Sequence, residues 1–222
     1  MFHDYNQYII DKRITMEPNN TALILIGFQN DYFSKNGILR GFLENEKRTD
    51  DVLSRTTSLI DSIKSTDVSI FSTPIIFSSD YSEILQSDGI LSAIKEVNAF
   101  KKGTPGAETV DEIKAFGDRV IEIPGKRGLN AFMQSDLENT LAKNEIKNVI
   151  FTGAVTSICV DSTARAAYEF GYRVTILGDC TAGRTDAEQD FFCGVVFPTY
   201  ATVSDSMTIV NQLTKQSSSA SS

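Results

Sequence analysis

Short apolar runs alternate with amphipathic stretches along most of the chain. Runs rich in β-branched and aromatic residues predict strands over residues 21–26, 68–72 with an extension at 75–78, 119–123, 148–152, 173–177 and 201–203. Amphipathic patterns predict helices over residues 51–65, 90–98, 134–144, 157–170 and 205–214. Alternation of this kind is typical of βαβ units, so we expect an α/β fold with a parallel sheet covered by helices on both faces.

The chain length favours a single domain. Its 222 residues suit one α/β unit with a sizeable buried core. We expect residues 1–18 to form an N-terminal extension packed on the domain, and residues 19–214 to form the domain itself. Residues 215–222 are rich in serine and are expected to be disordered.

Charge and rare residues exclude several classes of function. A net charge of -8 disfavours nucleic acid as a partner, and no apolar run reaches the roughly 18 residues that span a bilayer. Three cysteines form an odd and sparse set, which favours a reducing, cytoplasmic location. The single histidine, His3, argues against a histidine metal site and against a Cys-His pair.

Three predicted strands are followed by residues that could take part in catalysis. Ligands of open parallel sheets bind beyond the carboxyl ends of the strands, where Gly27, Lys126 and the turn from Gly153 to Cys159 follow their strands. A helix N-terminus and a nearby ammonium both stabilise a thiolate, so Cys159 is a candidate nucleophile. A lone cysteine is more often a packing residue, and we assign that role to Cys180 and Cys193.

Several segments in order resemble the isochorismatase-like cysteine hydrolases. In that family the first strand is followed by Asp, an apolar residue, Gln, Asn or Arg, Asp and Phe, and here residues 23–33 read LILIGFQNDYF. The substrate-side loop of the family is similar to residues 103–108, its lysine segment to residues 126–132 and its nucleophile turn to residues 153–160. The segments that follow the turn in the family match residues 171–174 and 179–182. The resemblance covers roughly residues 18–214.

The resemblance implies a three-layer α/β/α Rossmann-like fold with a six-stranded, mostly parallel sheet. It also implies an Asp-Lys-Cys triad that hydrolyses amides, ureides or related C–N bonds through an acyl-enzyme, here on Cys159 beside Lys126. It predicts a cis peptide at Val155–Thr156 and oxyanion donors among the amides near Ile158 and Cys159. Related proteins imply a homo-oligomer, a dimer or a tetramer.

Gly27 stands at the position of the triad aspartate. Glycine cannot move a proton, and the loss of such a group costs about 10²–10⁴ in rate. Three explanations remain. The aspartate was replaced deliberately, or the natural protein has Gly27 and is catalytically silent, or another group replaces the missing base. That group would be a water or another carboxylate, for which Asp31 is a weak candidate. The intact Cys159 and Lys126 favour the first explanation.

The resemblance also bears on metal and cofactor. Nicotinamidases in this family bind a metal through an Asp-x-His pair and a further histidine after the second strand. Here Asp80 is present without a following histidine. We therefore expect no catalytic metal and no cofactor, and we disfavour nicotinamide as the substrate.

Five residues are candidates for binding a small substrate. The polar or charged ones are Gln29 and Arg127, and the aromatic ones are Phe33, Tyr81 and Phe132. For each there is an alternative role: backbone hydrogen bonding for Gln29, a surface ion pair for Arg127 and core packing for the aromatic residues. The leading hypothesis is a cysteine hydrolase impaired by Gly27. The alternatives are a non-catalytic binding module and, less favoured, an isochorismate vinyl-ether hydrolase.

Overall fold

A parallel sheet forms the centre of the molecule. The computed structural model describes residues 16–85 and 88–217. Within these ranges the sheet has six strands in the order β3-β2-β1-β4-β5-β6, and every neighbouring pair is parallel. The strands are β1 (Thr21–Ile26), β2 (Ser69–Thr73), β3 (Ile121–Glu122), β4 (Asn148–Ala154), β5 (Arg173–Ala182) and β6 (Thr202–Ser204). The predicted fold class is confirmed, and the sheet is parallel throughout.

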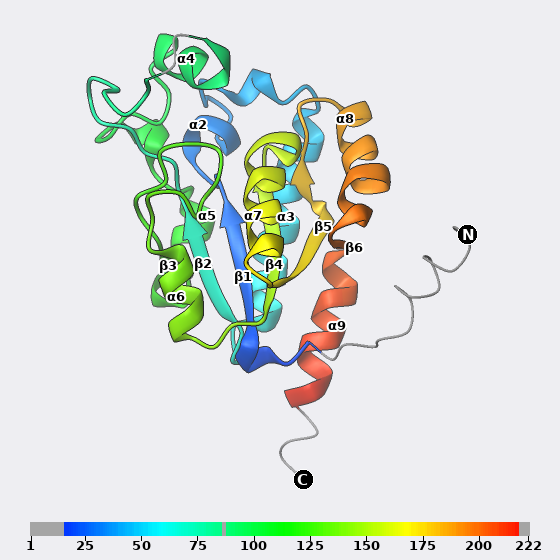
Figure 1. The fold of residues 1–222 in the computed structure, drawn as a ribbon. Coiled ribbons are helices and arrows are strands. Elements are labelled where there is room, and N and C mark those ends of the chain that lie inside the picture. The colour runs from blue at the N-terminus through cyan, green and yellow to red at the C-terminus, as the bar shows by residue number, and fades with distance from the viewer. Residues whose placement is uncertain (1–15, 86–87, 218–222) are drawn as a thin grey trace, which may run out of the picture.

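Helices cover both faces of the sheet (Figure 1). They are α2 (Asn30–Phe33), α3 (Glu46–Ile63), α4 (Gly89–Glu96), α5 (Asp111–Lys114), α6 (Leu137–Lys143), α7 (Asp161–Glu169), α8 (Asp186–Phe191) and α9 (Ser206–Ser217). Helices α3 and α9 contribute to one buried apolar cluster and α6 and α7 to the other. None of the described helices combines the length and apolar character that crossing a bilayer demands.

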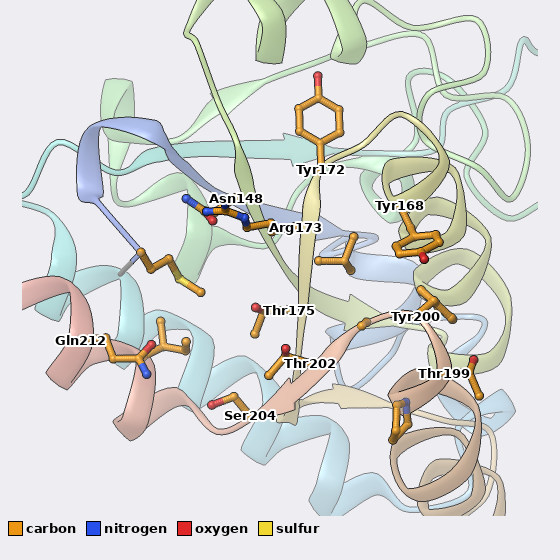
Figure 2. Close-up of a pocket in the computed structure, with 15 residues that line it drawn as sticks. Asn148, Tyr168, Tyr172, Arg173, Thr175, Thr199, Tyr200, Thr202, Ser204 and Gln212 are labelled. Carbon is orange, nitrogen blue, oxygen red and sulfur yellow. The ribbon is translucent and has the colours of Figure 1, made fainter. Parts of the chain in front are cut away.

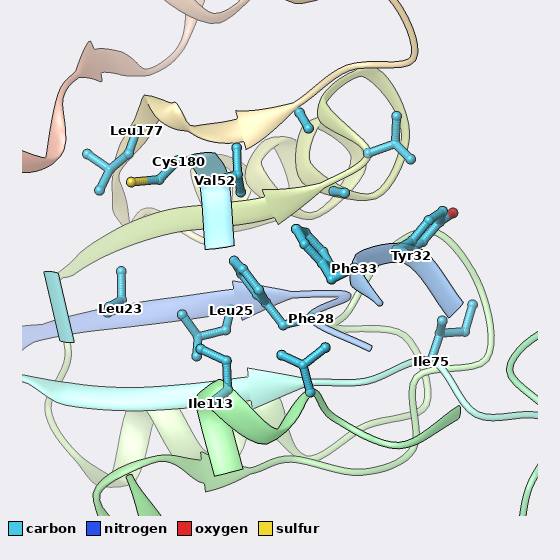
Figure 3. Packing of buried hydrophobic residues seen from close by; sticks show 14 of the residues in the cluster. Leu23, Leu25, Phe28, Tyr32, Phe33, Val52, Ile75, Ile113, Leu177 and Cys180 are labelled. Carbon is cyan, nitrogen blue, oxygen red and sulfur yellow. The ribbon is translucent and has the colours of Figure 1, made fainter. Parts of the chain in front are cut away.

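Strand β1 shows why the sheet lies between two layers. Its side chains alternate, so Leu23 and Leu25 belong to the cluster with α3 and α9, whereas Ala22, Ile24 and Ile26 belong to the cluster with α6 and α7. All five side chains are fully buried. Figure 3 shows the first cluster, in which Phe28 and Phe33 follow the end of β1. The site beyond β1 therefore rests on a packed core.

Several element boundaries differ from the predicted ones. Strand β2 ends at Thr73, because Pro74 has no amide to donate, and the predicted extension at 75–78 keeps only an isolated bridge between Phe77 and Lys101. Strand β3 is reduced to two residues, whereas β5 runs five residues beyond the predicted end at Leu177. Helix α9 continues to Ser217, past the predicted boundary at 214, while residues 1–15 and 218–222 of the predicted extension and tail lie outside the described residues.

Candidate active site

Cys159 lies in a tight turn between β4 and α7. Residues Thr156–Val160 form a single π-type turn, in which the carbonyl of Val155 accepts from the amides of Ile158 and Val160, each at 3.1 Å. Such turns are frequent at functional sites. The Cys159 residue is 7 % exposed, so most of it is buried against the rest of the protein.

Two predictions for this turn need correction. The cis peptide lies between Ala154 and Val155, one bond before the predicted Val155–Thr156, because β4 continues to Ala154 and the chain leaves the sheet there. The amide of Ile158 is already used by the carbonyl of Val155. Of the predicted oxyanion donors, the amide of Cys159 itself is therefore the one that stays a prediction.

Lys126 contacts Cys159 although the two residues follow strands that are not neighbours in the sheet, β3 and β4. It follows β3 by four residues, and its side chain is almost fully buried, with the residue 1 % exposed. Its Nζ donates to Sγ of Cys159 at 3.5 Å. In the described ranges Lys126 forms no ion pair with a carboxylate. The structure thus brings the predicted lysine and cysteine together in a nearly dry environment.

Gly27 borders the same turn. Its φ of +68° lies in the left-handed region, and a Cβ there would lie 3.0 Å from the carbonyl oxygen of Ala154. The neighbouring strand has a matching glycine, because a Cβ on Gly153 would lie only 1.9 Å from the carbonyl oxygen of Ile26. The ends of β1 and β4 are therefore pressed together, and the backbone at residue 27 suits a glycine.

Two polar residues after Gly27, Gln29 and Asp31, form hydrogen bonds with the backbone of neighbouring segments. Gln29 donates to the carbonyls of Ile75 and Ala107 at 2.9 and 2.7 Å, and its own oxygen accepts from the amide of Ile75. Asp31 accepts from the amide of Phe100 at 2.6 Å. Burial raises the pKa of Asp31, although backbone hydrogen bonds oppose the shift. Both side chains bind backbone groups, which agrees with the alternative role given for Gln29, and its role in substrate binding stays a prediction.

The other predicted substrate residues also have partners within the fold. Phe33 stacks on Phe28 at 4.7 Å, and the hydroxyl of Tyr81 donates to the carbonyl of Ala99 at 2.7 Å. Phe132 packs against Phe170 and Tyr172, and Arg127 pairs with Glu83 at 3.4 Å and donates to the carbonyl of Ile76. These contacts correspond to the alternative roles of core packing and ion pairing. Their role in substrate binding stays a prediction.

Two residues outside the predicted set hold the site together. The hydroxyl of Thr163 donates to the carbonyl of Cys159 at 2.7 Å and accepts from the amide of Ala131 at 3.0 Å. It therefore links the loop that carries Lys126 to the turn that carries Cys159. Gln189 of α8 accepts from the hydroxyl of Thr156 at 2.6 Å. Thr163 lies four residues after Cys159 on a helix, and that spacing is the only signal of its role in the sequence.

The carboxylate of Asp80 has hydrogen-bond partners in the segment that follows β2. Asp80 accepts from the hydroxyl of Ser78 at 2.7 Å and from the amide of Ser82 at 3.1 Å. These hydrogen bonds lower the pKa of Asp80 to about 2. The carboxylate of Asp80 therefore closes a local turn.

A separate cavity lies at the other end of the strands, where β4 and β5 begin. It has a volume of about 550 Å³ and is lined by the starts of β4 and β5, by β6 and by the end of α7 (Figure 2). Asn148, Tyr172, Arg173 and Thr202 are among its walls. None of the predicted catalytic residues contributes to it.

Comparison with known proteins decides the family. The model of the isochorismatase domain matches residues 21–208, which is most of the chain. The chain belongs to the isochorismatase family. This result confirms the resemblance that the sequence motifs carry.

Two relatives with named activities are similar to this chain over most of their length. Nicotinamidase 3 of Arabidopsis thaliana is 27% identical over 168 residues, which are 75% of this chain and 76% of the relative. The ureidoacrylate amidohydrolase RutB of Cronobacter sakazakii is 29% identical over 196 residues, covering 79% and 81% of the two chains.

Solved structures show the same fold. A cysteine hydrolase from Pseudomonas syringae pv. phaseolicola superimposes with a TM-score of 0.80 at 18% identity, over 90% of this chain and 95% of the other. An N-carbamoylsarcosine amidase from Thermoplasma acidophilum gives a TM-score of 0.66 at 22% identity, over 84% and 96%.

Proposed function

We propose that the chain hydrolyses the C–N bond of a small amide or ureide through an acyl-enzyme on Cys159. The observation that supports this most is the 3.5 Å contact between Nζ of Lys126 and Sγ of Cys159, with both residues buried. An ammonium beside a sulfur stabilises the thiolate, which is the attacking form of cysteine. The names of the relatives, amidase and amidohydrolase, agree with this class of reaction.

The proposed reaction has two halves. The thiolate attacks the carbonyl carbon, the S–C bond forms, the C–N bond breaks and the amine leaves with a proton. Water then attacks the acyl carbon and regenerates the thiol. Gly27 offers no side chain for the proton transfers, so we expect a rate below that of an intact triad by about 10²–10⁴.

The test is a panel of small amides and ureides, including nicotinamide, ureidoacrylate and N-carbamoylsarcosine. We expect slow turnover of at least one member and an acyl adduct on Cys159 by intact-protein mass spectrometry. Cys159→Ser should abolish both signals, whereas Cys193→Ser, which alters a half-buried cysteine on another segment, should preserve them. A folded protein that turns over no substrate and forms no adduct would contradict the proposal.

A second candidate function is binding without catalysis. The observation that favours it is the backbone of Gly27, whose positive φ and close approach to Ala154 fit a glycine. This candidate predicts that a substrate-like amide raises the melting temperature without being consumed. It also predicts that Cys159 reacts with iodoacetamide no faster than Cys193 does.

A further inference from the structure

Strand β5 carries a wide bulge beside the end of β4. Phe151 of β4 pairs with Ile176 of β5, but Gly153 pairs with Thr181, so two steps along β4 correspond to five steps along β5. Bulges are frequent next to active sites, where they change the direction of the chain and of its side chains. The extra residues of β5 lie where β4 passes into the turn that carries Cys159, so a group that holds the bulge is well placed to hold the turn as well.

Gln189 of α8 binds this bulge through its amide nitrogen. The residue is buried, and its Nε2 donates to the carbonyl of Gly178 at 3.1 Å and to the hydroxyl of Thr181 at 3.0 Å. A carbonyl oxygen can only accept, so the contact with Gly178 fixes which end of the amide is the nitrogen. The amide oxygen of Gln189 is therefore the end that is left to face other partners.

The amide oxygen of Gln189 binds the nucleophile turn. It accepts from the hydroxyl of Thr156 at 2.6 Å, and both side chains are buried. Thr156 is the first residue of the π-type turn and lies three residues before Cys159. Because the amide offers only its oxygen at this point, the hydroxyl of Thr156 is the donor. One side chain thus connects α8, the bulge of β5 and the turn.

The preceding residue of α8 adds a second contact to the same turn. Glu188 accepts from the hydroxyl of Ser157 and pairs with Arg184 at 2.7 Å. Two consecutive residues of α8 therefore bind two consecutive residues of the turn. This is the turn whose cysteine contacts Nζ of Lys126 at 3.5 Å, so a shift of the turn would change the distance between sulfur and amine.

We infer that Gln189 is a positioning residue for the nucleophile, which sets the place of the Cys159 sulfur relative to Lys126 by binding Thr156 and the bulge of β5. This inference rests on the proposed function. The attraction between an ammonium and a thiolate falls as their distance grows, so a displaced turn leaves less of the sulfur in its attacking form. Gln189 acts through Thr156 and transfers no proton itself.

The experiment measures the rate at which iodoacetamide alkylates Cys159 as a function of pH. In Thr156→Val, which removes the hydroxyl and keeps the shape, we expect the rate at pH 7 to fall about threefold to tenfold, as for the loss of one buried hydrogen bond. The inflection of the profile should move to higher pH. Thr156→Ser keeps the donor and should retain most of the rate. Gln189→Met should show the same kind of loss, and the double variant with Thr156→Val should lose no more than Gln189→Met alone.

Thr21→Val is the matched control, because it removes a buried hydroxyl that donates to the carbonyl of Glu17 at 2.6 Å at the start of β1. It should lower the midpoint of urea denaturation and leave the profile of Cys159 unchanged. A shift as large as that of Thr156→Val would mean that lost stability alone moves the profile, and would refute the role of Gln189.

Two further outcomes separate this inference from the proposed function. If Cys159 of the unaltered protein reacts no faster than Cys193, the proposed function fails and the inference fails with it. If Cys159 reacts fast while Thr156→Val and Gln189→Met both leave its profile unmoved, the role of Gln189 is refuted and the hydrolase survives.

Discussion

At the scale of single residues, the site is defined by a lysine with an unusual environment. Lys126 is 1 % exposed and contacts the sulfur of Cys159, but in the described part of the chain it has no carboxylate partner. A buried ammonium without a counter-charge is costly, whereas a thiolate beside it offsets that cost. The pair therefore works best as a unit.

Replacement of Lys126 by Met should separate function from stability. Methionine has a similar length and fills the same buried space without a charge, so we expect the free energy of unfolding to be unchanged or to rise. The rate of Cys159 alkylation at pH 7 should fall at least tenfold, because the ammonium no longer stabilises the thiolate. Urea denaturation and timed labelling measure the two effects. An unchanged labelling rate would refute the role of Lys126.

Gly27→Asp should restore the triad at a cost in stability. An L-residue at a φ of +68° is strained by about 1–2 kcal/mol, and the new Cβ would meet the carbonyl oxygen of Ala154 at 3.0 Å. We expect the midpoint of urea denaturation to fall and hydrolysis of the panel to accelerate. Gly27→Asn is the control, since it brings the same strain without the charge. A rate gain in both variants, or in neither, would contradict the assignment of position 27.

At the scale of elements, Thr163 links the two segments that carry the reactive groups. Thr163→Val removes the hydroxyl that bonds the carbonyl of Cys159 and the amide of Ala131. We expect a loss of about 1–3 kcal/mol in the free energy of unfolding, because buried polar groups lose their partner. The labelling of Cys159 should slow as the lysine loop loosens.

Thr152→Val provides the matched control for that change. The hydroxyl of Thr152 in β4 is buried and, in the described ranges, has no hydrogen-bond partner. Its removal should therefore leave stability unchanged or improve it. Equal losses for both variants would show that Thr163 acts only by packing.

The nucleophile turn should be sensitive to acid through Glu188. Burial works to raise its pKa, but hydrogen bonds from Ser157 and Arg184 prevail and lower it below the ordinary 4.5. The carboxylate thus contributes stability that is fully present above about pH 4.5 and is lost as the pH falls through the lowered value. Glu188→Gln should flatten the stability curve between pH 6 and pH 3, as measured by urea denaturation. A curve with unchanged slope would contradict this account.

The sequence predicts elements better than it predicts their ends and contacts. Strand β1 is predicted at Thr21–Ile26 and found there, because its apolar run begins after Asn20 and ends at Gly27. The contact of Lys126 with Cys159 follows from both residues lying beyond strand ends. The contacts of Gln29, Phe33 and Arg127 could not be predicted in this way, because their partners are distant in sequence or are set by the local fold. Gln29 binds a backbone carbonyl, Phe33 stacks on an aromatic ring and Arg127 pairs with a carboxylate.

At the scale of the whole molecule, the candidate active site and the separate cavity lie at opposite ends of the strands. The candidate active site lies at the carboxyl ends of β1 and β4, and the 550 Å³ cavity lies where β4 and β5 begin. Strand β4, with its seven residues, keeps these two ends apart by roughly 20 Å, at about 3.3 Å per residue. Effects of substitutions at such distances are usually independent.

Thr202→Phe tests that independence by filling part of the cavity from β6. We expect the rate of Cys159 alkylation to stay within twofold of the unaltered protein, because the intervening sheet is close-packed and its strands are held by hydrogen bonds on both sides. Combined with Lys126→Met, it should add nothing to the loss of at least tenfold expected from that variant alone. A larger or smaller loss in the double variant would mean that the two edges are coupled through β4 and β5, and the cavity would then belong to the working site.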